Sequence, residues 1–145
     1  MTFMRNATIS RLSDTGLTII PSTEDLRGRT VVDRDGRVLG KVHDLLIDDQ
    51  QHKPRFLLVA HGGFLGLGEA KSFIPVDAIT EITENQVRID HTLEHVAAAP
   101  PYDPSLIAER SYHRSVYDHY GYQPYWAAGH RYPDYPGAYL PGQIR

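Results

Sequence analysis

The fold is decided by one stretch of the chain, residues 28–48, which reads GRTVVDRDGRVLGKVHDLLID. The β-branched residues at 30–32 predict a strand. The Asp-Gly pair after them predicts a tight turn in which Gly36 takes a positive φ. Residues 38–47 return as a second strand, and Gly40 inside it predicts a bulge or a sharp bend. The stretch therefore predicts a hairpin with a bent second strand, which a small barrel needs in order to turn a corner.

Further strand signals lie on both sides of this hairpin. The continuous apolar run at 55–60 has the length of a strand and predicts a central position in the sheet. Pro75 lies where a strand would end, since a missing N–H does least harm there, and Gly28 marks the turn into the hairpin. The remaining predicted elements are short strands at 17–20, 72–74, 81–83 and 86–89 and one helical turn at 76–79. Five or six short strands separated by turns favour an all-β barrel or sandwich.

The composition changes sharply at Pro100. All nine tyrosines and the single tryptophan follow it, as do seven of the ten prolines when Pro100 itself is counted. Valine, leucine and isoleucine are concentrated before it. This asymmetry predicts an N-terminal segment at 1–24, a β domain at 25–91 and a C-terminal extension at 92–145.

Two helices are predicted in the extension. Residues 92–99 are compatible with a helix, and Thr92 is its predicted N-cap. A longer helix is predicted near 105–120, where Gly121 would end it. One apolar stripe along this helix is formed by Leu106, Tyr112, Val116 and Tyr120. The residues at 122–145 show no periodicity and predict irregular structure.

Charge and composition exclude several classes of function. The net charge of −3 argues against a general nucleic-acid binder, which is usually basic. The absence of cysteine excludes disulfides, thiolate catalysis and sulfur-ligated metals. No stretch approaches the ~20 apolar residues that span a bilayer, and residues 1–9 lack a signal pattern. We therefore expect a cytoplasmic protein.

The central part of the chain resembles the PRC-barrel family over roughly residues 26–90. The resemblance rests on the stretches GRTVV at 28–32 with DG at 35–36, LGKVHDLLID at 39–48, FLLV at 56–59 ahead of the glycine-rich 62–68, and FIPVDAI at 73–79. The family includes the cytoplasmic barrel of the photosynthetic reaction centre H subunit and the C-terminal domain of the ribosome maturation factor. The resemblance implies a small PRC-type β-barrel of five to six short antiparallel strands, used for protein contacts, with no catalytic residues and no cofactor.

The extension adds to this resemblance. The Pro-Tyr segment at 99–104 and the end of the predicted helix at 117–121 are similar to stand-alone bacterial members of the family, many of which are linked to stress response. Residues 1–24 are polar and cannot be a transmembrane helix such as that of the H subunit, and they are too few for the first domain of the maturation factor. The specific functions of those two proteins are therefore not carried over.

Two motifs invite a ligand-binding interpretation that the details disfavour. The loop at 63–68 spaces two glycines as a phosphate-binding loop does, but Glu69 follows where a lysine is required, so an inter-strand loop is favoured. The turn at 33–36 echoes the start of a calcium loop, yet its glycine falls at the fourth position rather than the sixth. A hairpin turn is favoured there.

Charged and histidine side chains give no clear site. Asp44, Asp48 and Asp49 could serve acid–base chemistry, but we interpret them as solvated charges at a strand end. His91 and His95 have a spacing used in zinc sites, but no third ligand is evident, so no metal is predicted. The eight histidines predict a stability that depends on pH near 6–7, because the ordinary pKa of histidine is ~6.5.

Two regions are candidate interfaces. The glycine-rich loop carries three bulky apolar side chains, which either cover the barrel mouth or meet a partner: Phe64, Leu65 and Leu67. The extension carries residues of the types that anchor protein interfaces, and the candidates there are Tyr112, Val116, Tyr117, Tyr120 and Trp126.

These observations favour a non-enzymatic interaction or assembly module that forms a homodimer. A barrel of ~65 residues is marginally stable alone, so a tail or a second chain would stabilise it by covering apolar surface. One alternative is a ribosome- or RNA-associated factor related to the barrel of the ribosome maturation factor. The extension does alternate aromatic and basic residues, but its acidic residues dilute the charge, so nucleic-acid binding is disfavoured. The other alternative is a barrel that binds a small ligand.

Overall fold

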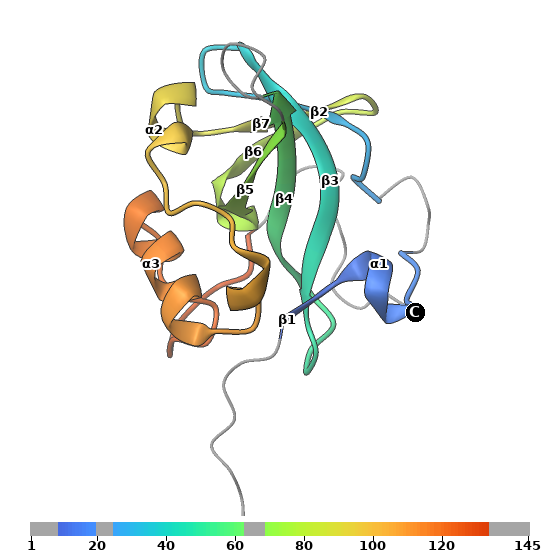
Figure 1. The fold of residues 1–145 in the computed structure, drawn as a ribbon, viewed down its shortest axis with the longest axis vertical. Helices are drawn as coiled ribbons and strands as arrows, with labels where there is room; N and C mark the ends of the chain where they lie inside the picture. The colour runs from blue at the N-terminus through green and yellow to red at the C-terminus, as the bar shows by residue number, and fades with distance from the viewer. Residues whose placement is uncertain (1–8, 20–24, 63–68, 134–145) are drawn as a thin grey trace, which may run out of the picture.

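The computed structural model describes residues 9–19, 25–62 and 69–133, which form one sheet with three short α-helices around it (Figure 1). The strands are β1 (Ile9–Arg11), β2 (Thr30–Val32), β3 (Val38–Asp48), β4 (Pro54–Gly62), β5 (Glu69–Pro75), β6 (Ile79–Ile82) and β7 (Gln86–Ile89). The helices are α1 (Leu12–Thr15), α2 (Leu93–Ala97) and α3 (Arg110–Tyr120), with 3-10 turns η3 (Val76–Ala78) and η4 (Pro104–Leu106). None of the helices in these ranges is long and apolar enough to cross a membrane.

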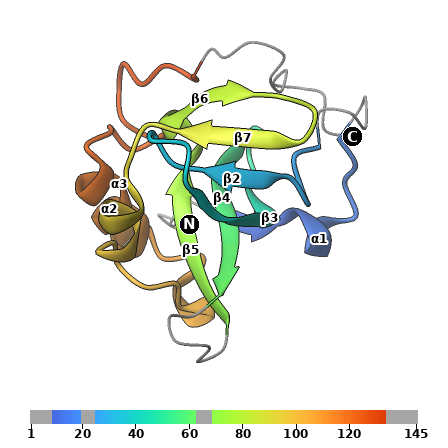
Figure 2. The ribbon, with the colours of Figure 1, turned by 90° about the horizontal axis from the view of Figure 1, so that it is seen from above.

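The sheet follows the order β5-β4-β3-β2-β7-β6, and β1 pairs with the end of β3. Neighbouring strands are antiparallel except β2 and β7, which run parallel. Figure 2 shows β2, β6 and β7 running across the direction of β4 and β5, so the sheet is strongly curled. The predicted all-β fold of barrel type is confirmed. The described sheet has seven strands rather than five or six, because β1 adds one, and it contains one parallel pair.

β3 is the strand that bends. Opposite β2 it carries one extra residue, since Val31 pairs with Gly40 and Val32 pairs with Val38. Opposite β4 the register of β3 shifts twice more. A Cβ atom on Gly40 would lie 2.2 Å from the carbonyl oxygen of Ala60. The bend predicted at Gly40 is therefore confirmed, and the close approach of the neighbouring backbone is the physical reason for a glycine there.

The other predicted turns also form. Gly36 has a φ of +85°, and its N–H donates to the carbonyl of Asp33 at 3.0 Å. Gly28, with a φ of +89°, lies in the turn that leads into β2. Pro75 ends β5 and is followed by η3, the predicted helical turn, and β6 and β7 form the predicted hairpin.

The N-terminal segment differs from its prediction. The strand predicted at 17–20 does not form over its described part, where only Ile19 makes an isolated bridge. The strand is instead β1, which pairs with the end of β3 and leads directly into α1. Gly16 ends α1 with a φ of +75° and turns the chain. The apolar patch that follows Gly16 packs into the core instead of pairing as a strand, since the side chain of Ile19 is buried.

Both predicted helices of the extension are present, but the longer one begins later than predicted. Thr92 caps α2 with its side chain, as predicted. The helix predicted at 105–120 is two elements, because η4 comes first and α3 begins only at Arg110. Pro104 opens η4, and proline is favoured at the first position of a helical turn. Gly121 ends α3 with a φ of +85°, as predicted.

The extension covers one side of the barrel. α2 and α3 lie on one side of the sheet and α1 on the other (Figures 1 and 2), and both α2 and α3 contact β5. The rings of Phe56 and Tyr117 are 5.1 Å apart, and those of Phe73 and Tyr112 are 5.3 Å apart. The barrel and the extension therefore share one hydrophobic core.

Candidate interaction site

The predicted anchors of the extension lie inside the chain's own core. Four of the five are buried: Tyr112, Val116, Tyr117 and Tyr120. In this fold they join α3 to the barrel and offer almost no surface to a second protein. The three apolar loop residues that were the other predicted interface lie outside the described residues: Phe64, Leu65 and Leu67.

Trp126, the fifth predicted anchor, is half-buried between two arginines. The guanidinium carbon of Arg110 lies 4.4 Å from the centre of the Trp126 ring, and that of Arg114 lies 5.6 Å away. The two arginines share one face of α3 because they are four residues apart. Within the described part of the chain neither arginine has a carboxylate partner. Their N–H groups can therefore bind an acidic group from outside.

The chain that follows α3 is held to the barrel by a buried ion pair. Nε of Arg55 donates to Asp48 at 2.8 Å, and both side chains are buried. The guanidinium of Arg55 also lies 4.6 Å from the ring centre of Tyr125 and 5.5 Å from that of Tyr132. These cation–π contacts fix the irregular segment at 121–133, which we call the strap, over the barrel.

A second contact fixes the strap near its end. Nε2 of His130 lies 3.1 Å from a carboxylate oxygen of Asp77, which belongs to η3, and both side chains are largely buried. Burial raises the pKa of Asp77, and the contact with His130 offsets only part of that effect.

The interpretation of three aspartates as solvated charges is wrong for two of them. Asp44 and Asp48 are buried, and only Asp49 is exposed. Asp44 accepts hydrogen bonds from the backbone N–H groups of Ser13 and Leu45 and from the hydroxyl of Ser13. Asp48 accepts two N–H groups of the turn after β3 besides Arg55. The prediction failed because α1, which was not foreseen, brings Ser13 against β3.

Asp33 is a structural centre that sequence reasoning assigned only to a turn. It is fully buried and accepts the N–H groups of Asp35, Arg37 and Leu93 and the Nε–H of Arg37. Burial raises the pKa of Asp33, but these donors outweigh it and hold the pKa below its ordinary value. Arg37 also reaches Glu94 with two hydrogen bonds, which lowers the pKa of Glu94 to about 2. These contacts tie α2 to the hairpin, as expected of a structural turn rather than a calcium loop.

Three histidine rings stack where α2, α3 and the end of the barrel meet. The ring centres of His91 and His95 are 5.1 Å apart, and those of His95 and His119 are 4.1 Å apart. Nε2 of His95 and Nε2 of His119 each contact the backbone carbonyl of the other residue, and Nε2 of His91 contacts the hydroxyl of Tyr122. Burial and the neighbouring His95 lower the pKa of His91. In the parts of the chain that the structure describes, no three side chains of ligand type are placed to hold a metal ion.

His113 lies deeper, between α3 and the barrel. Its side chain is fully buried, and its ring lies 5.4 Å from that of Phe56. Nε2 contacts the carbonyl of Ile107 at 2.8 Å, while Nδ1 has no partner among the described residues. Burial lowers the pKa of His113. The sequence contained no local signal for this placement beyond the number of histidines.

An apolar groove lies on the exposed surface of the described residues. It has a volume of about 360 Å³ and lies between the start of β3, the end of β4 and α2, lined mainly by Val38, Leu39, Leu93, Val96 and Ala97. Val38 is 65% exposed and is the one large hydrophobic residue exposed among those described. Arg37 and Glu94 lie next to the groove as an ion pair.

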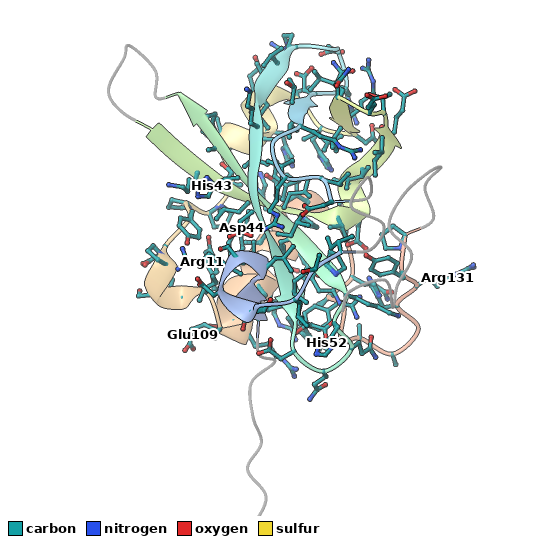
Figure 3. The ribbon with its side chains drawn as sticks, turned by 90° about the vertical axis from the view of Figure 1, so that its right-hand side faces the viewer. Arg11, His43, Asp44, His52, Glu109 and Arg131 are labelled. Carbon is teal, nitrogen blue, oxygen red and sulfur yellow. The ribbon has the colours of Figure 1, made fainter. Side chains whose placement is uncertain are left out.

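A larger, polar cavity of about 500 Å³ lies on the side of α1. Figure 3 views this face, on which Arg11, Asp44 and His52 are labelled. Arg11 and His52 line the cavity, and His52 has a φ of +57°, which is uncommon for a residue other than glycine. Arg11 is already paired with Asp14, and Asp49 is hydrogen-bonded to Ser10. Among the groups that line this cavity, Arg11 is thus neutralised by Asp14, and Asp49 accepts a hydrogen bond from a hydroxyl.

Comparison with known proteins gives one family. The family model described as PRC-barrel domain matches residues 22–96, which is more than half of the chain. The match includes the predicted barrel and all but the last residue of α2. No curated protein matches the chain.

Proposed function

The chain belongs to the PRC-barrel family, and on this premise we propose that it is a non-enzymatic assembly module whose first partner is a second copy of itself. The buried carboxylates support a structural role, because Asp33, Asp44 and Asp48 use their oxygens on backbone N–H groups. Such groups stabilise the barrel and are not poised to exchange protons with a substrate.

The observation that carries the proposal is the exposed Val38 beside the apolar groove. Burial of Val38 in a partner's groove would remove apolar surface from water on both sides. Arg37 and Glu94 next to the groove supply one charge of each sign. A surface with both signs can pair with its own copy across a two-fold axis.

The test is the molar mass in solution, measured by size-exclusion chromatography with light scattering at micromolar concentration. We expect the natural chain to be a dimer and the variant Val38→Asp to be a monomer, because the new charge would be buried unpaired. The matched control is Thr18→Asp, which adds the same charge at an exposed position. A monomeric natural chain, or a dimer unaffected by Val38→Asp, would reject the proposed interface.

A second candidate function, binding to RNA or ribosomes, is favoured by the two arginines that flank Trp126. Arginine and aromatic side chains together bind single-stranded nucleic acid through charge and stacking. The test is co-sedimentation with ribosomal subunits at increasing salt, because phosphate contacts weaken steeply with ionic strength. Binding that is lost in Arg110→Gln with Arg114→Gln would favour this candidate, and absence of binding at low salt would reject it.

The proposal of an assembly module also includes a cytoplasmic location and a stress-related role. The location is supported by the lack of a spanning helix among the described residues. The stress-related role rests on the resemblance of the extension to that of stand-alone family members. Comparing the growth of a deletion strain with that of its parent under osmotic and acid stress would test it.

A further inference from the structure

We infer that the junction between the barrel and the extension is a clasp operated by protons, in which charging the imidazoles of α2 and α3 releases α3 from the barrel. Five of the eight histidines make contacts that hold the extension to the barrel or hold its helices together: His91, His95, His113, His119 and His130. The inference goes beyond the proposed function and does not depend on dimerisation.

The hydrogen bonds of the stack define the neutral state. A carbonyl oxygen can only accept, so Nε2 of His95 and Nε2 of His119 must carry hydrogens. A neutral imidazole with a hydrogen on Nε2 has none on Nδ1. The only free position for a further proton on either ring is therefore Nδ1, and the two ring centres are 4.1 Å apart. Two positive charges at that separation repel each other, whereas in the released helices the rings can separate in water.

His113 adds a second penalty of a different kind. Its Nε2 must also donate, because its partner is the carbonyl of Ile107. The added proton would sit on Nδ1, which is buried without a hydrogen-bond partner among the described residues. An unpaired N–H and a positive charge inside the core both destabilise the docked state.

Other charged groups at the junction change the pKa values of His91 and His113, but they do not reverse the downward shift of either. Asp90 near His91 and Glu109 near His113 favour the charged rings, whereas Arg34 and Arg110 disfavour them. The net shift in pKa is downward for both histidines. Tyr120 lies edge-on to the stack and is neutral at these pH values, because burial raises its pKa further.

His130 lies outside the histidine stack. Its contact is with Asp77 of η3, so the end of the strap would stay attached while α3 opens. Release would uncover Phe56 and Phe73 together with the side of β5 that α3 contacts. The clasp thus makes an apolar surface of the barrel available only in acid.

Cysteine labelling tests this directly, because the natural chain has no cysteine. Val116→Cys places a thiol under α3, and Leu57→Cys places one in β4 of the barrel; both positions are fully buried. Ser111→Cys, exposed on α3, corrects for the effect of pH on thiol reactivity. Each imidazole that must stay neutral weakens docking by up to about tenfold per pH unit below ~6.5. We expect the corrected labelling rate of Val116→Cys to rise about 10- to 100-fold between pH values of about 7.5 and 5.5.

Three results would overturn the inference. The corrected rate at Val116→Cys could stay constant with pH, or it could rise only together with that at Leu57→Cys, which would mean global unfolding. It could also rise equally when His113→Phe and His119→Phe are added, which would exclude these rings as the cause. Hydrogen exchange of the natural chain is a second measurement that needs no substitution. We expect the protection factors of the α3 amides to fall at least tenfold in acid, while those of the β4 amides stay unchanged. Equal decreases in α3 and β4 would contradict the clasp.

Discussion

His95 and His119 hold each other through their backbone carbonyls. Nε2 of His95 lies 3.0 Å from the carbonyl oxygen of His119, and Nε2 of His119 lies 2.7 Å from that of His95. The pair joins α2 to α3 across 24 residues of sequence. α2 has only five residues, and a helix that short is unstable in isolation. The position of α2 therefore depends on this pair and on the contacts that Asp33 and Arg37 make with it.

Replacing His119 by phenylalanine should destabilise the chain at neutral pH. His119→Phe keeps a flat ring in the stack but leaves the carbonyl of His95 without its donor. We expect a loss of about 1–2 kcal/mol in the free energy of unfolding, measured by urea denaturation. The control is His43→Phe, at an exposed position of β3, where we expect a change within about 0.5 kcal/mol. Equal losses in both variants would show that the reciprocal pair contributes nothing specific.

The stability of the natural chain should fall as the pH is lowered below the pKa of histidine in the unfolded chain. His91 and His113 have pKa values below the ordinary value in the folded chain, so between the two pKa values the unfolded chain binds more protons. Stability is then complete above ~6.5 and decreases as the pH falls. We expect a lower urea midpoint at about pH 5.5 than at about pH 7.5. His113→Phe should reduce the difference, and coinciding midpoints in the natural chain would contradict the prediction.

The parts of the fold that followed from the sequence are those with local causes. The turn at Gly36 and the cap at Thr92 each depend on the residue itself and its near neighbours, and both form as predicted. The bend at Gly40 also forms, because a glycine inside a strand marks a bend or a close approach whichever backbone comes near it. The failures involve partners far along the chain. Asp33 accepts the N–H of Leu93, 60 residues away, and Asp44 is buried because α1 packs against β3. No local pattern reports such contacts.

The candidate site shows the same division. The aromatic residues of α3 were identified by their spacing, but their side chains face the barrel of the same chain. An amphipathic stripe predicts that a helix is covered and does not predict what covers it. The exposed Val38 was missed because a single apolar residue next to a turn carries no pattern.

Gly40→Ala should be strongly destabilising, because its Cβ would lie 2.2 Å from the carbonyl oxygen of Ala60. The contact is with backbone, so either β3 or β4 must move. We expect a loss of about 3 kcal/mol, at the upper end for overpacking, measured by urea denaturation. Gly121→Ala is the matched control, since its Cβ would meet nothing within 4 Å and only its φ of +85° is unfavourable. There we expect a loss of about 1 kcal/mol. If the two losses are equal, the close approach at Gly40 is not what requires glycine.

Removing Arg55 should cost more than removing the whole buried pair. Arg55→Met leaves the carboxylate of Asp48 buried without its counter-charge, so we expect a loss of about 3–5 kcal/mol in the free energy of unfolding. Arg55→Met combined with Asp48→Asn removes both charges and should recover part of that loss. A double-mutant cycle from urea denaturation measures the coupling, and purely additive losses would mean that the ion pair is not coupled in the fold.

Removing the whole extension should unfold the barrel, whereas release of α3 alone keeps two contacts of the extension in place: the N–H of Leu93 on Asp33 and the ring of His130 on Asp77. A chain ending at residue 91 loses α3, which covers the rings of Phe56 and Phe73, and it also loses the N–H of Leu93 from the buried Asp33. We expect poor dispersion in its amide NMR spectrum and exposed apolar surface that binds a hydrophobic dye. A peptide of residues 92–133, added in excess, should restore dispersion, because the contacts it makes are the ones that were removed. A well-dispersed spectrum from the truncated chain alone would show that the barrel is an independent folding unit and that the shared core is dispensable for folding.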